Sequence, residues 1–208
     1  ETNRDLKFKD YNVMWEWSIS DLDGFWSAIW DYFDIQCSQT YTNVLANRGV
    51  ATAEWFPGSR LNHAQNVLKH ATTDPNREAI VVHSETFTRK SLTWRELERQ
   101  VGSVAASLRG MGVTQGDRVV AILPNTETAL IAFLATSSLG AVWSLCAPDM
   151  GHVAILDRFQ QIEPKVLIAQ DGYSHAGKSI ERPDICPVYA SDADDDRRRI
   201  DLCSIRIT

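Results

Sequence analysis

Two groups of residues have the chemistry to bind a metal ion. His63 and His70 lie seven residues apart in a stretch with helical spacing, but no Cys, Asp or Glu completes a set at ligand spacing. The second group is the acidic cluster Asp192, Asp194, Asp195 and Asp196. The arginines that follow it directly compete for these carboxylates. We interpret both groups as solvated side chains. The sequence therefore predicts no metal site, and it offers no catalytic residue.

The cysteines are the remaining reactive side chains. Cys37, Cys146, Cys186 and Cys203 are scattered through the chain without C-x-x-C spacing. Cys146 falls in a segment that we expect to be a buried strand. Such spacing is typical of reduced thiols in a cytoplasmic protein and favours neither a disulfide framework nor a zinc site.

Loops that hold a triphosphate are missing from the sequence. Neither G-x-x-x-x-G-K-[ST] nor G-x-G-x-x-G occurs in the 208 residues. Loops of these kinds hold phosphates with successive backbone N–H groups. No residue is therefore predicted to hold a nucleotide triphosphate.

The elements that must position any site lie between Arg118 and Lys178. Apolar runs bounded by turn residues predict three strands: Val119–Leu123, Ala141–Cys146 and Val166–Ala169. Two helices are expected between them, one capped by Thr126 and one over Val153–Ile162. Strands that alternate with helices favour a parallel sheet. The predicted fold class is α/β, with a mostly parallel sheet flanked by helices.

The sequence before this region predicts a hairpin and two helices. Ala79–His83 and Phe87–Ser91 have the composition of paired strands. Thr93 and Glu96 form the pattern of a capping box, and the helix that they open should end at a left-handed Gly112. Another helix is predicted from Asn62 as its cap to Ala71, with one apolar face.

The first part of the chain, Tyr11 to Phe33, is unusually aromatic. Phe25, Ile29 and Tyr32 recur at helical spacing, which predicts a helix from about Asp21 to Asp34 with Ser20 as its cap. The helix could be an aromatic binding platform, or it could dock on a larger body through its aromatic face. We favour docking, because aromatic side chains mainly supply buried area.

Composition narrows the class of protein. The hydrophobic content of 44% allows a real core, and the net charge of −6 argues against nucleic-acid binding. Neither a membrane-spanning apolar run nor a signal-peptide pattern is found in the sequence. The chain begins with Glu1 rather than Met, so we expect it to be a piece of a longer protein.

Three stretches resemble the AMP-forming acyl-CoA synthetases of the adenylate-forming superfamily. Residues 92–144 follow the pattern of a helix, G-V-x-x-G-D-R-V, a strand, P-N, a helix and G-A-V. W-F-P-G-S-R-L-N-H-A-Q-N, residues 55–66, is similar to the entry segment of the acetyl- and acetoacetyl-CoA synthetase branch. S-L-C-A-P-D-M-G, residues 144–151, and L-D-R-F-Q-Q-I-E-P-K-V-L, residues 156–167, resemble the acetoacetate-specific members. The resemblance covers roughly Tyr11 to Lys178.

The resemblance implies an acetoacetate–CoA ligase that uses ATP, Mg²⁺ and coenzyme A. Members of the family place a T-S-G-T-T-G-x-P-K loop and the other catalytic features after the region that is present in this chain. The chain is therefore expected to carry part of the scaffold and to be inactive alone. A non-catalytic interaction module or an inactive remnant stays open as the alternative.

One ligand element is implied by the resemblance. Residues 171–178 are similar to a loop that helps to hold coenzyme A phosphates, and the family loop ends in Arg-Gly-Gly-Arg or Arg-Gly-Gly-Lys. The counterparts here are His175, Gly177 and Lys178, with histidine in place of the first arginine. Gly177 allows close backbone approach, and Lys178 adds a flexible positive charge. A surface loop with no ligand is the other interpretation.

We expect three segments. Residues 1–62 form an N-terminal segment of the acetyl/acetoacetyl-CoA synthetase type with an aromatic-rich helical appendage, and residues 63–178 form the start of a truncated AMP-binding domain. Residues 179–208 lose the apolar pattern, so we expect a disordered tail that arises from a shifted reading frame or a mispredicted exon end. We also expect poor solubility, because Val166–Ala169 would form an open sheet edge and Trp26, Trp30 and Trp55 an exposed patch.

Overall fold

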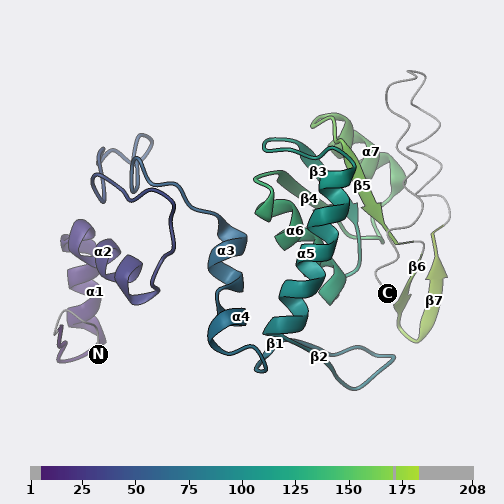
Figure 1. Ribbon diagram of the computed structural model, residues 1–208, viewed down its shortest axis with the longest axis horizontal. Helices are drawn as coiled ribbons and strands as arrows, with labels where there is room; N and C mark the ends of the chain where they lie inside the picture. The colour runs from purple at the N-terminus through teal and green to yellow at the C-terminus, as the bar shows by residue number, and fades with distance from the viewer. Residues whose placement is uncertain (1–5, 171, 183–208) are drawn as a thin grey trace. The chain divides into compact units, whose positions relative to one another are not determined.

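The computed structural model describes residues 6–170 and 172–182 (Figure 1). The chain divides into two compact units, Glu1–Asn66 and Val67–Thr208. Within the described residues, none of the helices combines the length and the apolar character that crossing a membrane requires. The expected disorder of the tail concerns residues that lie mostly outside the described part of the chain.

The first unit opens with two helices, α1 (Tyr11–Ser20) and α2 (Leu22–Tyr32). Asp10 caps α1 by accepting a hydrogen bond from Val13 N–H at 3.1 Å, and Asp21 caps α2 by accepting one from Gly24 N–H at 2.9 Å. The helix predicted from about Asp21 to Asp34 is therefore confirmed as α2, but its cap is Asp21 rather than Ser20, and α1 was not predicted. Residues of α1 are not buried, so its sequence lacks the apolar periodicity that would have revealed it.

The aromatic side chains of the first unit pack against one another. Trp30 of α2 lies 5.0 Å from Tyr41 and 4.8 Å from Phe56, measured between ring centroids. Trp26 meets Trp55 edge to face, with centroids 5.5 Å apart, and both rings stay partly exposed. The segment that carries these partners has isolated bridges, Gln39 with Arg60 and Leu45 with Trp55, and no longer strand.

The helix expected from Asn62 is interrupted. Asn62 Oδ1 accepts a hydrogen bond from Gln65 N–H at 3.2 Å, which confirms the cap. Two short helices follow, α3 (His63–Leu68) and α4 (His70–Thr73). Thr72 N–H bonds to Lys69 O, only three residues back, so the turn tightens where the α-helical pattern breaks.

The hairpin of the second unit lies slightly away from its predicted position. β1 (Glu78–Val82) pairs antiparallel with β2 (Lys90–Thr93). Phe87, predicted to lie in the second strand, belongs to the connecting loop and accepts a hydrogen bond from Ser84 N–H through its carbonyl. The loop is longer than its β-branched and aromatic composition suggested.

Helix α5 (Trp94–Gly110) follows the sequence prediction at both ends. The capping box of Thr93 and Glu96 is complete, because each side chain accepts a hydrogen bond from the other residue's backbone N–H. At the other end, Gly112 has φ +81°, and Val113 N–H reaches back to Leu108 O at 3.0 Å. This is a Schellman motif, which requires a left-handed residue at that position.

Three parallel strands form the sheet that we expected, in the order β4-β3-β5. The strands are β3 (Arg118–Ile122), β4 (Val142–Cys146) and β5 (Val166–Ala169). They are joined by helices α6 (Glu127–Ser138) and α7 (His152–Gln160). Among the described strands, β5 pairs only with β3 and so lies at an edge of the sheet.

The core of the second unit lies on both faces of β3. Val120 and Ile122 pack with Ile155 and Phe159 of α7. Val119 and Ala121 alternate with them and are equally buried, so they serve the opposite face. Figure 1 shows α5 packed beside α6, as their contacts require. A strand buried on both faces explains the continuous apolar run in the sequence.

After β5 the chain forms a second hairpin, β6 (Gly172–His175) and β7 (Lys178–Glu181). The sequence predicts a loop over residues 171–178 and a tail from residue 179, whereas residues 172–175 and 178–181 are paired strands joined by a two-residue turn. The apolar pattern is too short here to identify two strands. Gly172 is required, because a Cβ atom there would lie 2.9 Å from Ile180 O.

Candidate functional site

The candidate site lies at the carboxyl-end edge of the parallel sheet. Ligands of open parallel sheets bind outside the carboxyl ends of the strands. In this chain those ends lead to Pro124–Asn125 after β3, Pro148 after β4 and Gln170 after β5. Gln170 N–H donates to Ile122 O at 3.2 Å, which extends the β5 pairing by one residue before the β6–β7 hairpin begins.

The hairpin turn places the three predicted site residues together. His175 and Lys178 are direct cross-strand partners, so their side chains leave the same face of the hairpin. Ala176 and Gly177 form the turn with φ +52° and +71°. Two successive positive φ values define a type I′ turn, which matches the twist of a two-residue hairpin.

All three predicted residues are exposed at the tip. The Gly177 N–H has an anionic acceptor within the chain, because it donates to Glu85 Oε2 at 3.3 Å. No sequence pattern predicted a role for Glu85, which lies in the β1–β2 loop, 92 residues away. A contact of that separation has no local pattern by which it could have been found.

The base of the hairpin is anchored to the loop after β4. Arg182 Nη1 donates to Pro148 O, and it also lies 3.3 Å from Met150 O. These carbonyls follow β4 at the carboxyl-end edge, so Arg182 ties the hairpin to that edge of the sheet. The tail assigned to residues 179–208 therefore contains a structural residue at its start.

A separate hollow of about 480 Å³ lies between β1, α6 and β4. Its apolar lining includes Ile80, Phe133, Trp143 and Leu145, and its polar lining consists of His83, Asn125, Thr126 and Glu127. Sequence reasoning missed this hollow, because its lining comes from three distant segments. Leu145 of β4 lines the hollow and is exposed, which the apolar run of the sequence did not indicate.

Thr126, which lines this hollow, does not make the capping hydrogen bond that the sequence predicts. Its Oγ1 is buried without a hydrogen-bond partner among the described residues, so it does not cap α6. Glu127, the first residue of α6, forms an ion pair with Lys90 instead. Burial raises the pKa of Glu127, but the hydrogen bond from Lys90, the backbone N–H and the lysine charge outweigh burial and leave the pKa lowered.

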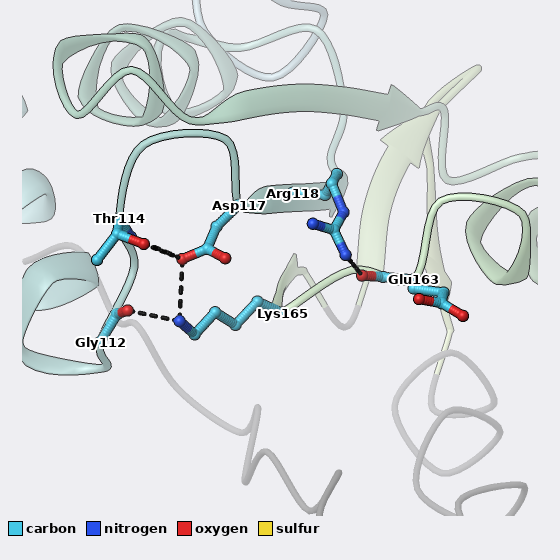
Figure 2. Close-up of polar contacts among 6 residues, drawn as sticks. All are labelled: Gly112, Thr114, Asp117, Arg118, Glu163 and Lys165. Atoms are coloured by element: carbon cyan, nitrogen blue, oxygen red, sulfur yellow. Dashed lines mark hydrogen bonds and ion pairs between the residues drawn. The ribbon is translucent and has the colours of Figure 1, made fainter.

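The G-D-R-V motif forms a polar cluster at the amino ends of the strands, away from the carboxyl ends where the candidate site lies (Figure 2). Asp117 Oδ2 accepts hydrogen bonds from Lys165 Nζ at 2.9 Å, Thr114 N–H at 2.7 Å and Thr114 Oγ1 at 2.9 Å. These bonds lower the pKa of Asp117 to about 2. Arg118 donates to the carbonyls of Ile162 and Glu163, each at 2.7 Å.

This cluster precedes β3 and β5 and joins the turns at their amino ends. Lys165 Nζ, Arg118 Nε and Arg118 Nη2 each donate to a protein acceptor, and Figure 2 shows the contacts of Lys165 and of Arg118 with Glu163. The cluster is therefore structural and lies away from the edge where a ligand would bind.

The predicted metal candidates do not assemble. Within the described residues, no group of three or more His, Cys, Asp or Glu side chains could hold a metal ion. The His70 ring contacts Trp94 at a tilt of 45°, with ring centroids 5.0 Å apart. The acidic cluster at residues 192–196 lies outside the described part of the chain.

The two cysteines in the described residues are free thiols. Cys37 is half-buried and Cys146 is buried. Burial raises the pKa of Cys146, against the charge and hydrogen bond of Arg158, which does not favour a reactive thiolate. Cys186 and Cys203 lie outside the described residues.

Comparison with known proteins gives two family matches. Residues 67–203 match the model of the AMP-binding enzyme family, and residues 11–67 match the acetyl-coenzyme A synthetase N-terminus. Acetoacetyl-CoA synthetase of Rattus norvegicus is 41% identical over 83% of this chain and 26% of its own length. Acetoacetyl-coenzyme A synthetase of Rhizobium meliloti (strain 1021) is 37% identical over 82% of the chain and 26% of its own length.

A solved structure agrees with these matches. Acetoacetyl-CoA synthetase from Streptomyces lividans is 44% identical and superposes with a TM-score of 0.84 over 89% of this chain and 29% of that one. The chain thus spans about a quarter of the length of the curated relatives that it matches. The family match covers well over half of the sequence, and it agrees with the predicted α/β fold. This chain belongs to the AMP-binding enzyme family.

Proposed function

We propose that this chain forms the N-terminal part of an acetoacetate–CoA ligase. In such a reaction the acetoacetate carboxylate attacks the α-phosphorus of ATP and releases diphosphate. The thiol of coenzyme A then attacks the acyl-adenylate carbonyl and releases AMP. One observation carries the proposal: the superposition on the Streptomyces lividans acetoacetyl-CoA synthetase at 44% identity and a TM-score of 0.84.

Within that function, the β6–β7 hairpin is proposed to contact a phosphate group of coenzyme A. Lys178 supplies the positive charge, and the Gly177 N–H supplies a backbone donor at an exposed turn. His175 stands beside Lys178 and gives a third donor, without the two-pronged geometry of an arginine. Such a site is weak alone, because an exposed ammonium and one N–H hold a phosphate against competing water.

ATP and Mg²⁺ are proposed as substrates of the whole enzyme, held by segments other than those described here. The 208 residues have no triphosphate loop. This observation favours the second candidate, an inactive or non-catalytic piece, for the polypeptide in isolation. A cytoplasmic location, and small-molecule partners rather than nucleic acid or membrane, remain predictions from the sequence.

A chimera tests the proposed function. Residues 11–182 of this chain would replace the matching segment of the Streptomyces lividans enzyme, and AMP formation would be followed with ATP, coenzyme A and either acetoacetate or acetate. We expect coenzyme-A-dependent AMP formation with acetoacetate above that with acetate. A folded chimera without this activity would favour the non-catalytic alternative, provided that the unmodified Streptomyces enzyme is active in the same assay.

A further inference from the structure

The tip of the β6–β7 hairpin touches the loop between β1 and β2. Figure 1 shows this loop reaching the hairpin tip, and the contact is the hydrogen bond from Gly177 N–H to Glu85 Oε2 at 3.3 Å. The two residues are brought together from positions 92 apart in the chain. Glu85 is exposed, so its carboxylate is not held there by packing.

This contact puts an anion on the donor that we assign to a phosphate. A carboxylate and a phosphate oxygen both accept hydrogen bonds from backbone N–H groups, and both are attracted by Lys178. They cannot occupy the same N–H together. A carboxylate beside a bound phosphate also repels it, and this repulsion is only partly screened at short range.

We propose that Glu85 is a competing anion that weakens phosphate binding at the hairpin tip and must leave Gly177 before the phosphate binds. This inference rests on the proposed function of the hairpin. It adds a residue that sets the affinity of that site, from a segment outside the hairpin.

The loop is built so that Glu85 can move without unfolding it. His83 Nδ1 donates to Thr88 O at 2.6 Å, and Ser84 N–H donates to Phe87 O at 3.2 Å. Thr86 N–H also donates to Ser84 Oγ at 3.3 Å. These contacts fix the shape of the loop, and none uses the Glu85 side chain.

The hairpin is held from its other end, so the tip stays in place when Glu85 leaves. Arg182 donates to the carbonyls of Pro148 and Met150 next to the sheet. Release of one exposed hydrogen bond at the tip therefore frees the Gly177 N–H without moving the hairpin.

The test uses the 208-residue chain and nuclear magnetic resonance, which detects weak binding. Coenzyme A is titrated into the wild type, E85Q and K178A while the Gly177 amide is observed. E181Q is the matched control, because Glu181 lies on the same hairpin but at the end away from the turn. We expect E85Q to tighten coenzyme A binding about threefold to tenfold, as loss of one close charge repulsion predicts. E181Q should change it less than twofold, and added salt should reduce the gain in E85Q.

A second readout needs no ligand. In E85A the Gly177 amide proton should shift upfield by more than in E181A, because a hydrogen bond to a carboxylate is lost. An unchanged Gly177 resonance would overturn the inference whatever the binding data show.

The outcomes separate this inference from the proposed function. If K178A weakens coenzyme A binding but E85Q does not tighten it, the hairpin site stands and the role of Glu85 is wrong. If coenzyme A causes no shift in wild type or E85Q, both the hairpin site and the role of Glu85 are wrong. Tightening by E181Q equal to that by E85Q would show a general charge effect and would also overturn the inference.

Discussion

Lys165 Nζ lies 2.9 Å from Asp117 Oδ2 and 2.6 Å from Gly112 O, so one ammonium group joins the end of α5 to the turns before β3 and β5 (Figure 2). The Gly112 carbonyl belongs to the left-handed residue of the Schellman motif. A lysine that binds this carbonyl satisfies a backbone acceptor just beyond the end of the helix. The G-V-x-x-G-D-R-V motif is thus explained by structure and needs no ligand.

The Asp117 cluster predicts a defined acid dependence of stability. The folded pKa of Asp117 is about 2, below its ordinary value of 3.8. Its stabilising effect is therefore complete above the ordinary pKa and is lost as the pH falls toward about 2. In urea unfolding, D117N should be less stable than wild type at pH 6, and the difference should shrink between pH 4 and pH 2.

The control for that experiment is D157N, which removes the same charge from the exposed surface of α7. We expect D157N to follow the wild type through the acid range. A D117N difference that stays constant between pH 6 and pH 2 would contradict the role assigned to the Asp117 carboxylate.

The capping box gives a second prediction. T93A removes the hydroxyl that accepts from Glu96 N–H at 3.3 Å and should lower the free energy of unfolding by about 1 kcal/mol. T93S keeps the hydroxyl and should lose much less. Urea unfolding of the two variants measures both values, and equal losses would show that the methyl group matters rather than the cap.

The turn at the hairpin tip gives a third prediction. Ala176 has φ +52°, a region that costs an L-residue about 1–2 kcal/mol. A176G should therefore slow amide exchange at Tyr173 and Ile180 by about fivefold. A106G is the comparison, because Ala106 is an exposed residue in the middle of α5. Glycine there should lower the free energy of unfolding by about 1 kcal/mol. Faster exchange in the A176G hairpin would contradict the type I′ assignment.

Elements with strong local signals were predictable from the sequence. Buried strands such as Val119–Leu123 are short and bounded by turn residues, and the structure has β3 there at Arg118–Ile122. Thr93 with Glu96 and the left-handed Gly112 were also correct, since capping chemistry acts within a few residues. These features place the sheet and its carboxyl-end edge.

Other features depend on contacts that the local sequence does not record. The α1 helix buries no residue, so its sequence has no apolar stripe to reveal it. The I′ turn uses Ala176 where Asn or Gly would have been the recognisable residue. Glu85 reaches Gly177 only because two hairpins meet in the fold. Thr126 occupies the N-cap position of α6, but its buried hydroxyl makes no capping hydrogen bond.

A fourth prediction concerns the isolated 208-residue chain. Adenylate formation depends on positioned charge around the triphosphate, and the sequence has no loop for it. We expect no ATP-dependent AMP formation above buffer with acetoacetate and coenzyme A. The expectation would be contradicted if the isolated chain formed AMP and a substitution in it abolished that activity.

The most direct test of the hairpin assignment is the Michaelis constant for coenzyme A in the chimera with and without K178A. We predict that K178A raises this constant about tenfold, as loss of one charge-assisted contact to phosphate would, while the constants for ATP and acetoacetate stay within twofold. K178R should recover most of the loss, because it keeps the charge. A K178A chimera whose Michaelis constant for coenzyme A equals that of the parent chimera would contradict the assignment.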